Sequence, residues 1–460
     1  MRLLSLACAI ALGLSSVAAY AATPNPAAKV PGSEAIVSKT LANGLKIVVW
    51  PDHDIPNANF YTFYKVGSRN EYPGITGLAH YFEHMMFNGT TKRAPGEFDK
   101  QMEAAGGSNN ASTSNDLTIY TDWFPSSALE TIFDLEGDRM ANLAFDPKVV
   151  ESERGVVYSE RRSSVDNDNF GTLMEQMQAT AFTAHPYQFP TIGWPSDIEG
   201  WKLDDLKKFF KTYYAPNNAV MVVAGDVDPA QVFALADKYL ASLQKQPAPT
   251  PVTTVEPEQQ GERRIVVERA DAQSPIVAYA FHSGIGAGSK DYPTLELLST
   301  ILSQGDSSRL HQRLVEKEQA ATQAGAFAEA GFDPGLLWVY AMLPPGGDMA
   351  KVEASLDDEL AKVARDGVTA AELEKARNLK SSAFWRGMAT INGKARALGT
   401  YEVFNNDYRK LFDAPAAYDA VTAADVQALA KKILRIQNRT TGLLKPVAAA
   451  PTADKKEAAK

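Results

Sequence analysis

Hydrophobic and polar positions alternate in four short segments, and the segments occupy equivalent places in the two halves of the chain. Such alternation predicts strands with one buried face. The four segments are 44–49, 57–66, 261–267 and 275–283. Each half also ends with a helical pattern that runs into an apolar strand, at 203–225 and 423–444. The matched offset of about 218–220 residues favours a duplicated domain, although two unrelated α+β domains could also share these patterns.

Longer stretches of the first half place apolar residues three and four positions apart, which predicts amphipathic helices. These stretches are 75–88, 96–105, 127–143, 147–163 and 169–182. Asn43-Gly44 is a hairpin turn signal before the first strand. Hairpins mixed with several helices predict an α+β fold of two homologous domains, each a mostly antiparallel sheet with helices packed on it.

Proline-rich and low-complexity segments indicate where the domains end. Residues 244–260 hold four prolines and no sustained apolar period, which is typical of a semi-extended linker. We therefore expect an N-terminal domain over 23–243 and a C-terminal domain over 261–446. The remaining residues, 447–460, are low in complexity and are expected to form a flexible tail.

The first 21 residues have the pattern of a cleavable signal peptide. Arg2 precedes an apolar run that reaches Ala19, and Ala19-Tyr20-Ala21 is a small-x-small cleavage site. Cys8 could suggest a lipoprotein cysteine, but the apolar run before it is too short, so lipidation is not favoured. No other apolar run approaches 18 residues, so we expect no membrane span. The prediction is export, most simply to a bacterial periplasm.

Composition narrows the classes of function further. The chain has 460 residues, of which 45% are hydrophobic and 22% charged, so it can bury sizeable cores. Its formal net charge of −9 argues against a nucleic-acid binder that works through bulk electrostatics. The single cysteine, Cys8, excludes a disulfide scaffold and a thiolate zinc site. Histidine is scarce, at six residues.

Two of the six histidines stand four residues apart, in His80-Tyr81-Phe82-Glu83-His84. On a helix they share one face, where two imidazoles can hold one metal ion. Glu83 lies beside them and could take a proton from water bound to that metal. Two histidines on a polar surface helix are the plain alternative, but the flanking residues are strongly apolar. The pattern predicts a zinc site of the inverted-zincin type, on a helix for which Thr76 is the candidate cap.

A catalytic zinc usually has a third protein ligand, and the segment 149–161 offers two candidates. Glu153 and Glu160 are seven residues apart, so they share one helix face. One could bind the metal while the other orients a ligand histidine, and the spacing does not decide which. A charge-rich helix is also often simply a solvated face.

These motifs resemble the pitrilysin/insulinase family of zinc metallopeptidases over nearly the whole chain. The resemblance rests on His-x-x-Glu-His and on Glu-Arg-x-x-Val-x-x-Glu about 75 residues later. It implies one zinc ion bound by His80, His84 and Glu160, with Glu83 as general base and Glu153 as supporting carboxylate. It also implies that residues 108–113 form an edge strand whose Ser108, Asn109, Asn110 and Ala111 bind substrate. Without the family, that segment would be interpreted as a Gly/Asn/Ser-rich loop.

By the same resemblance, a chain of this length is expected to form half of the clamp-like chamber of the family. Its two domains resemble subunits of mitochondrial processing peptidase and bacterial relatives, in which two chains complete the clamp. In the second half, the positions equivalent to His80, Glu83 and His84 are Leu298, Ile301 and Leu302. We therefore expect one zinc ion per chain and a second domain that packs without metal.

The chain also departs from the family pattern at the Arg/Tyr pair with which many relatives hold substrate. The equivalent positions here are Val315 and Thr322. Arg309 and Arg313 could substitute, but arginines on such a helix are more often solvated. We expect a homologous partner subunit to supply the pair, in a hetero-oligomer or, alternatively, a homodimer.

The sequence thus predicts an exported zinc endopeptidase that hydrolyses peptides or unfolded segments. The alternative is a non-catalytic peptide-binding or assembly subunit of a peptidase complex. The intact Glu83 argues against the alternative, whereas Val315 and Thr322 argue mildly for it. Neither the natural substrate nor the partner can be identified from these residues. Of the other histidines, His185 is expected to be structural, and His53, His282 and His311 ordinary.

Overall fold

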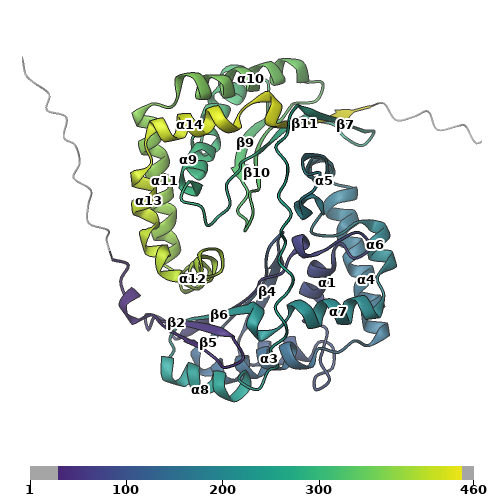
Figure 1. The fold of residues 1–460 in the computed structure, drawn as a ribbon, viewed down its shortest axis with the longest axis vertical. Coiled ribbons are helices and arrows are strands. Elements are labelled where there is room, and N and C mark those ends of the chain that lie inside the picture. Colours follow the sequence, from purple (N-terminus) through teal and green to yellow (C-terminus); the bar gives the residue numbers. More distant parts are fainter. Residues whose placement is uncertain (1–28, 448–460) are drawn as a thin grey trace, which may run out of the picture.

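The computed structural model describes residues 29–447 of the chain and contains two β-sheets, each in its own half (Figure 1). The predicted signal peptide with Cys8, and all of the predicted tail except residue 447, lie outside the described residues. No helix within residues 29–447 is long and apolar enough to cross a membrane.

The first sheet has six strands in the order β1-β2-β6-β3-β5-β4. Only β2 and β6 pair in parallel, and every other neighbouring pair is antiparallel. The central strand β6 is buried at all seven positions, which matches its continuous apolar sequence AVMVVAG. The strands are β1 (Val37–Thr40), β2 (Lys46–Pro51), β3 (Asn57–Tyr64), β4 (Ser108–Thr113), β5 (Thr118–Pro125) and β6 (Ala219–Gly225).

The second sheet repeats this topology with five strands in the order β7-β11-β8-β10-β9. Strand β7 takes the place of β2 and pairs in parallel with the last strand, β11, as β2 does with β6, and the remaining pairs are antiparallel. The strands are β7 (Arg263–Arg269), β8 (Ile276–His282), β9 (Gln323–Ala328), β10 (Leu336–Met342) and β11 (Arg439–Pro446). The predicted α+β fold with two related, mostly antiparallel sheets is therefore confirmed.

Each sheet packs one face against helices of its own half, and the five helical patterns predicted from the sequence are all present. In the first half these helices include α1 (Leu78–Met85), α2 (Glu97–Ala104), α3 (Leu129–Asn142), α4 (Pro147–Arg161), α6 (Pro195–Gly200), α7 (Leu203–Tyr213) and α8 (Pro229–Tyr239). In the second half they include α9 (Tyr292–Ser303), α10 (Met349–Asp366), α11 (Ala370–Met388), α13 (Ala414–Ala420) and α14 (Ala423–Ile433). Helix α4 continues into a π-helical turn, Arg162–Asp166.

The opposite face of each sheet is covered by a helix from the other half of the chain (Figure 1). Helix α5 (Asn169–Ala181) places Leu173 and Met177 in a core with β8, β10 and β11. Helix α12 (Ile391–Asn405) places Leu398 in a core with Phe63 and the neighbouring strands β2 and β6. The two halves therefore complete each other's hydrophobic cores.

Glycines allow close packing at both of these crossings. A Cβ atom at Gly399 of α12 would lie 2.0 Å from the Phe63 ring, and one at Gly442 of β11 would lie 2.2 Å from Met177 Sδ. Gly399→Ala is therefore expected to lower the free energy of unfolding by about 1–3 kcal/mol through overpacking. The midpoint of urea unfolding measures this loss.

Gly387→Ala, in α11, is the matched control, because a Cβ there would meet no atom within 4 Å. This variant is expected to raise stability by about 0.5–1 kcal/mol, since alanine is the better helix former. Equal stabilisation by both alanine variants would contradict the close packing of α12 on the first sheet.

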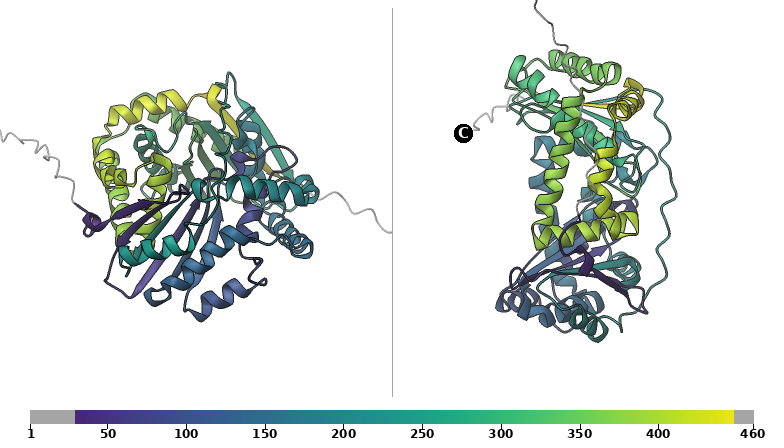
Figure 2. Two further views of the ribbon diagram at one scale, coloured as in Figure 1. Left: turned by 60° about the horizontal axis from the view of Figure 1, so that its bottom comes forward. Right: turned by 90° about the vertical axis from the view of Figure 1, so that its left-hand side faces the viewer.

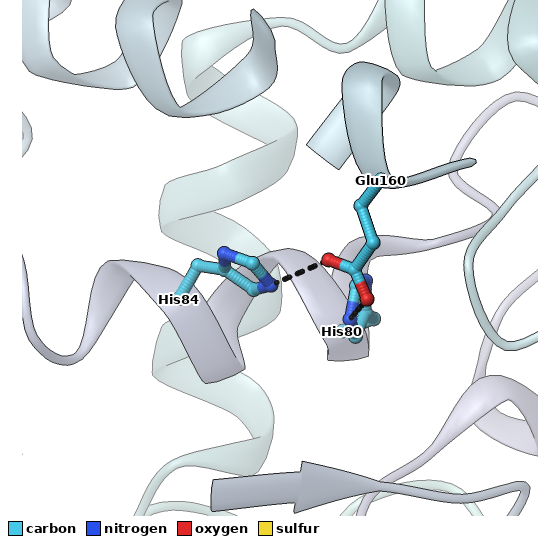
Figure 3. A group of neighbouring side chains, drawn as sticks. All are labelled: His80, His84 and Glu160. Atoms are coloured by element: carbon cyan, nitrogen blue, oxygen red, sulfur yellow. Dashed lines mark ion pairs between the residues drawn. The ribbon is translucent and has the colours of Figure 1, made fainter. Parts of the chain in front are cut away.

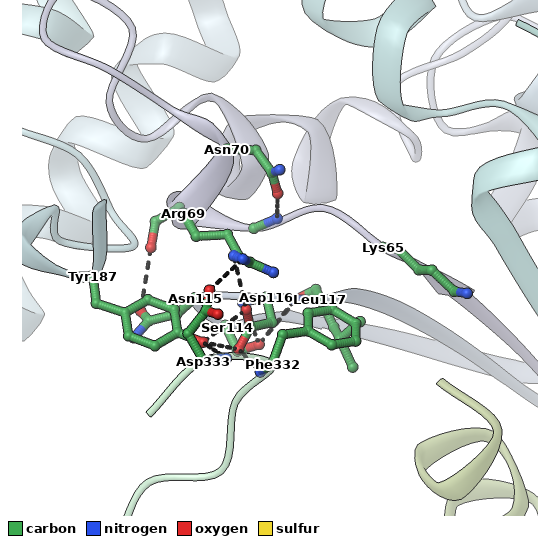
Figure 4. A network of polar contacts seen from close by, with 12 residues as sticks. Lys65, Arg69, Asn70, Ser114, Asn115, Asp116, Leu117, Tyr187, Phe332 and Asp333 are labelled. Carbon is green, nitrogen blue, oxygen red and sulfur yellow. Dashed lines mark hydrogen bonds and ion pairs between the residues drawn. The ribbon is translucent and has the colours of Figure 1, made fainter. Parts of the chain in front are cut away.

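A buried polar network also joins the halves (Figure 4). Arg69 pairs with Asp116, at 3.3 Å, and with Asp333 of the second half. The Tyr187 hydroxyl donates to Asp116 at 2.8 Å and accepts the backbone N–H of Asp333 at 3.1 Å. His185 is buried beside it, with Nε2 3.0 Å from Asp333 Oδ2, which agrees with the structural role expected for this histidine.

The segment between the halves, residues 244–260, contains no helix or strand and runs along the outside of the molecule (Figure 2). Glu256 in this segment accepts three backbone N–H bonds, from Thr183, Ala184 and His185. The segment is thus attached to the loop that follows α5.

Candidate metal centre

Helix α1 carries both histidines of the motif, and its first turn is fixed by a carboxylate from outside the helix. Glu71 is buried and accepts the backbone N–H groups of Gly77 and Ala79, both at 2.7 Å. The predicted cap, Thr76, is wrong: the N-cap is Gly77, with φ +88°, while the Thr76 hydroxyl donates to Asp197. A Cβ at Gly77 would lie 2.5 Å from the carbonyl oxygen of Ile192, so only glycine fits there.

Three buried tyrosine hydroxyls fix the rest of α1. Tyr214 donates to the carbonyl oxygen of Ala79 at 3.1 Å, and Tyr120 donates to that of Phe82 at 2.8 Å. Tyr81, on α1 itself, donates to the carbonyl oxygen of Val150 on α4 at 2.9 Å. These three hydrogen bonds thus fix the orientation of α1 against its neighbours.

The side chains of His80, His84 and Glu160 converge between α1 and α4 (Figure 3). Nε2 of His84 lies 3.3 Å from Glu160 Oε2, and Nε2 of His80 lies 3.6 Å from Glu160 Oε1. Ligand atoms at the corners of a zinc tetrahedron with bonds of about 2.1 Å stand about 3.4 Å apart. The three side chains therefore fit a zinc ion in both atom type and spacing.

Glu153 lies on the other side of the His84 ring. Its Oε1 is 2.8 Å from Nδ1 of His84, and its Oε2 accepts the amide N–H of Asn88 at 2.8 Å. A proton on Nδ1 leaves the lone pair of Nε2 directed toward Glu160. The spacing left the roles of the two glutamates open, and the family resemblance implied Glu160 as the ligand. In the structure Glu160 faces both imidazoles, and Glu153 orients one of them.

Glu83 is held beside the cluster by a residue of β4. The Thr113 hydroxyl donates to Glu83 Oε2 at 2.6 Å. Burial raises the pKa of Glu83, and the hydrogen bond from Thr113 and the charge of His84 partly offset that rise. The carboxylate thus keeps one oxygen free of protein partners among the described residues.

The two histidines are in different electrostatic surroundings. Burial, and then the neighbouring His84, lower the pKa of His80 to about 3, so His80 is neutral at pH 7 and can bind metal. Burial acts to lower the pKa of His84 as well, but Glu153 and the other carboxylates outweigh it and raise that pKa. Glu160 is the open side of the cluster, with 43% of its side chain exposed.

The predicted substrate-binding residues lie on β4, which is an edge strand of the first sheet. The backbone N–H of Ser114 donates to the carbonyl oxygen of Leu117, so the backbone groups of alternate residues before Ser114 point away from β5. These residues are Asn109, Ala111 and Thr113. Ser108 and Asn110 instead pair with β5, opposite Trp123 and Thr121. A free strand edge thus runs up to Thr113, the partner of Glu83.

The equivalent positions in the second half lie in a hydrophobic core. Leu298, Ile301 and Leu302 are buried on α9. Val315 is half-buried against the same core, and the Thr322 hydroxyl donates to the carbonyl oxygen of Met342. Within the part of the chain that the structure describes, the cluster of His80, His84 and Glu160 is the only group of three potential metal ligands.

Arg309 and Arg313 are only partly exposed, with 16% and 20% of their side chains accessible, and both are paired with carboxylates rather than simply solvated. Arg309 Nε donates to Glu372 at 2.6 Å, and Arg313 Nε donates to Glu318 at 2.9 Å. Both arginines thus have carboxylate partners within the second half, which argues against their replacing the missing Arg/Tyr pair.

The functional residues that the sequence did not reveal are Glu71, Asn88 and Thr113. Thr113 fell within the predicted edge strand, but its contact with Glu83 depends on how β4 packs against α1. Glu71 is six residues from Gly77 in a loop, and no periodic pattern marks it as a helix cap.

The fold consists of two related halves with one candidate metal site, and comparison with known proteins identifies its family. The chain belongs to peptidase family M16. The insulinase (peptidase family M16) model matches residues 48–193, and the peptidase M16 inactive domain model matches residues 200–380. The resemblance noted from the motifs is therefore confirmed.

Relatives known from sequence and from solved structures match nearly the whole chain. The zinc protease PqqE of Helicobacter pylori is 33% identical, with 95% of this chain and 98% of that protein covered. The crystal structure of a protease from Helicobacter pylori matches with a TM-score of 0.86 at 32% identity, covering 89% of this chain and 99% of that chain. The periplasmic protease PqqL of Escherichia coli shares the fold, with a TM-score of 0.74 at 20% identity, covering 94% of this chain and 52% of that chain.

Proposed function

We propose that this chain is a zinc-dependent endopeptidase that hydrolyses peptides or unfolded polypeptide segments. The observation that carries the proposal is the convergence of His80, His84 and Glu160 on one point, with the Glu83 carboxylate beside it. When bound there, zinc would lower the pKa of a water molecule and polarise the scissile carbonyl. Glu83 takes the proton of the attacking water and returns it to the departing amine.

The free edge of β4 supports the choice of an extended peptide as substrate. Asn109, Ala111 and Thr113 direct backbone groups away from the sheet, and an added strand would pair with them. Asn110 Oδ1 accepts the N–H of Ala111 at 2.9 Å, and a substrate carbonyl would replace that bond. An unfolded segment can take up the extended conformation over several residues without first losing other backbone partners, so the site favours unfolded segments.

Export, subunit composition and metal content are parts of the same proposal. The signal-like residues 1–21 support export to the periplasm. The Escherichia coli protease is about twice as long as the region it shares with this chain, which supports completion of the site by a homologous partner subunit. The apolar Leu298, Ile301 and Leu302 support one zinc ion per chain.

The alternative is a non-catalytic peptide-binding or assembly subunit. Val315 and Thr322 favour it, because the grip on the substrate is incomplete in one chain. The family model described as inactive covers residues 200–380, the part without the histidine motif. Glu83 lies within residues 48–193, and a purely structural metal site has no use for such a base. The peptidase is therefore the better supported function.

Metal removal tests the proposal. The chain should bind one zinc ion, lose hydrolysis of an unstructured fluorogenic peptide on chelation, and recover it on addition of zinc. The assay is run on the chain alone and together with a homologous chain that carries Arg and Tyr at the positions of Val315 and Thr322. Activity only in the mixture supports the shared site. Zinc binding without hydrolysis in either sample would favour the assembly subunit.

A further inference from the structure

Both glutamates that face the histidines are followed directly by an arginine, and both arginines turn toward one segment, residues 190–201. This segment contains the short helix α6. Arg154 donates to the carbonyl oxygens of Ile198 at 2.7 Å, Glu199 at 2.8 Å and Trp201 at 2.8 Å. The carbonyl groups at the end of α6, which have no partner within the helix, thus accept hydrogen bonds from Arg154, the residue after Glu153.

Arg161, the residue after Glu160, fixes the end of α4. Its side chain is 5% exposed. The guanidinium donates to both oxygens of Glu175, at 2.7 and 2.8 Å, and to the carbonyl oxygen of Gly193 at 2.8 Å. Because the planar guanidinium binds both oxygens at once, it fixes the distance and the orientation of Glu175 relative to Arg161. Arg161 therefore holds α4 against α5 and against the segment 190–201 at once.

The other side of the segment 190–201 contacts the start of α1. Asp197 Oδ2 accepts the N–H of Gly74 at 3.0 Å and the hydroxyl of Thr76 at 2.7 Å. Trp201 Nε1 donates to the carbonyl oxygen of Thr76 at 3.1 Å. The backbones of Gly77 and Gly193 touch: a Cβ on Gly193 would lie 2.7 Å from Gly77 Cα.

We infer that Arg154 and Arg161 are positioning residues of the metal centre, which act through the segment 190–201. Helix α1 supplies two ligands and α4 the third, so the metal geometry depends on how far apart the two helices are held. The two helices touch directly where Tyr81 donates to Val150, and the segment adds a second connection, bonded to α4 on one side and to the start of α1 on the other. This inference rests on the proposed zinc function and names the residues that set its metal affinity.

The test is zinc affinity, measured by competition with a chromophoric chelator on the full chain. Arg161→Met is expected to weaken zinc binding about 10–100-fold, the usual effect of losing a residue that orients ligands. Arg161→Lys keeps the charge without the fork and should recover part of the loss. Asp197→Ala breaks the contact on the α1 side and should weaken zinc binding in the same direction.

Arg439→Met is the matched control for general destabilisation. Arg439 is also a buried arginine, with Glu262 at 2.7 Å and Asp357 as partners, but it lies on β11 of the second half. This variant should lower the melting temperature of the zinc-free chain and leave the zinc affinity unchanged. Equal zinc affinity in Arg161→Met and the unmodified chain would overturn the inference, as would an equal loss in Arg439→Met.

The two proposals fail in different ways. An unmodified chain that does not bind zinc contradicts the proposed function itself. An unmodified chain that binds zinc normally, with an Arg161 variant that binds it equally well, contradicts only the positioning role. If Arg161→Met does not fold, Arg161→Lys and Asp197→Ala decide: unchanged zinc affinity in both overturns the role, and a loss in both supports it.

Discussion

Replacement of Glu83 by glutamine is expected to abolish peptide hydrolysis while zinc stays bound. The amide has the shape of the carboxylate. It can still accept the hydrogen bond that the Thr113 hydroxyl donates to Glu83 at 2.6 Å in the unmodified chain. It cannot take a proton from water, so the general-base contribution is lost. That contribution is typically about 10²–10⁴-fold in rate.

The measurement is kcat for an unstructured peptide together with zinc content per chain. Glu103→Gln is the control, because Glu103 is an exposed glutamate at the end of α2. Thr113→Val should show a smaller fall in kcat, since it removes only the residue that holds Glu83. A Glu83→Gln chain that cleaves at the unmodified rate would show that another group is the base.

Loss of the third ligand is the second large effect that we expect. Glu160→Ala leaves only His80 and His84, so zinc should dissociate on dialysis and hydrolysis should fall to background. Glu153→Ala keeps all three ligand atoms and removes the partner of His84 Nδ1, which is expected to weaken zinc binding about 10–100-fold.

Lys148→Ala is the control on the same helix, because Lys148 is an exposed residue in the first turn of α4. It should retain zinc and activity. Zinc content after dialysis distinguishes the three variants. The assignment of the two glutamates is reversed if Glu153→Ala loses its zinc completely and Glu160→Ala retains it.

The sequence predicted the elements of the fold better than the way in which they pack. Alternation located β2, β3, β7 and β8, and helical spacing located the five helical patterns, because these signals depend on neighbouring residues. The strands β1, β5, β9 and β10 were not predicted. The exchange of α5 and α12 between the halves could not be predicted in this way. Helix α12 carries no marked amphipathic pattern, and nothing in its sequence indicates that Phe63, more than 300 residues earlier, lies against it.

The site, too, was predicted only in the part that depends on residues close together in the sequence. His80, Glu83 and His84 lie within one helical turn, so their spacing alone predicted that they act together. Whether Glu153 or Glu160 completes the cluster depends on the angle between α1 and α4, which the spacing of seven residues does not contain. The family resemblance supplied that answer, and the geometry agrees with it.

The exchange of helices also has a consequence for how the chain is made. The three strands β2, β3 and β6 are complete once residue 225 has been synthesised, but α12, which covers their second face, follows only at residues 391–405. At a synthesis rate of roughly 5–20 residues per second, that apolar face waits about 9–36 seconds for its cover. A nascent chain stopped in the linker would be a substrate for chaperones and proteases. The second half, although it holds no metal ligands, thus supplies the helix that covers the second face of the metal-binding half's sheet.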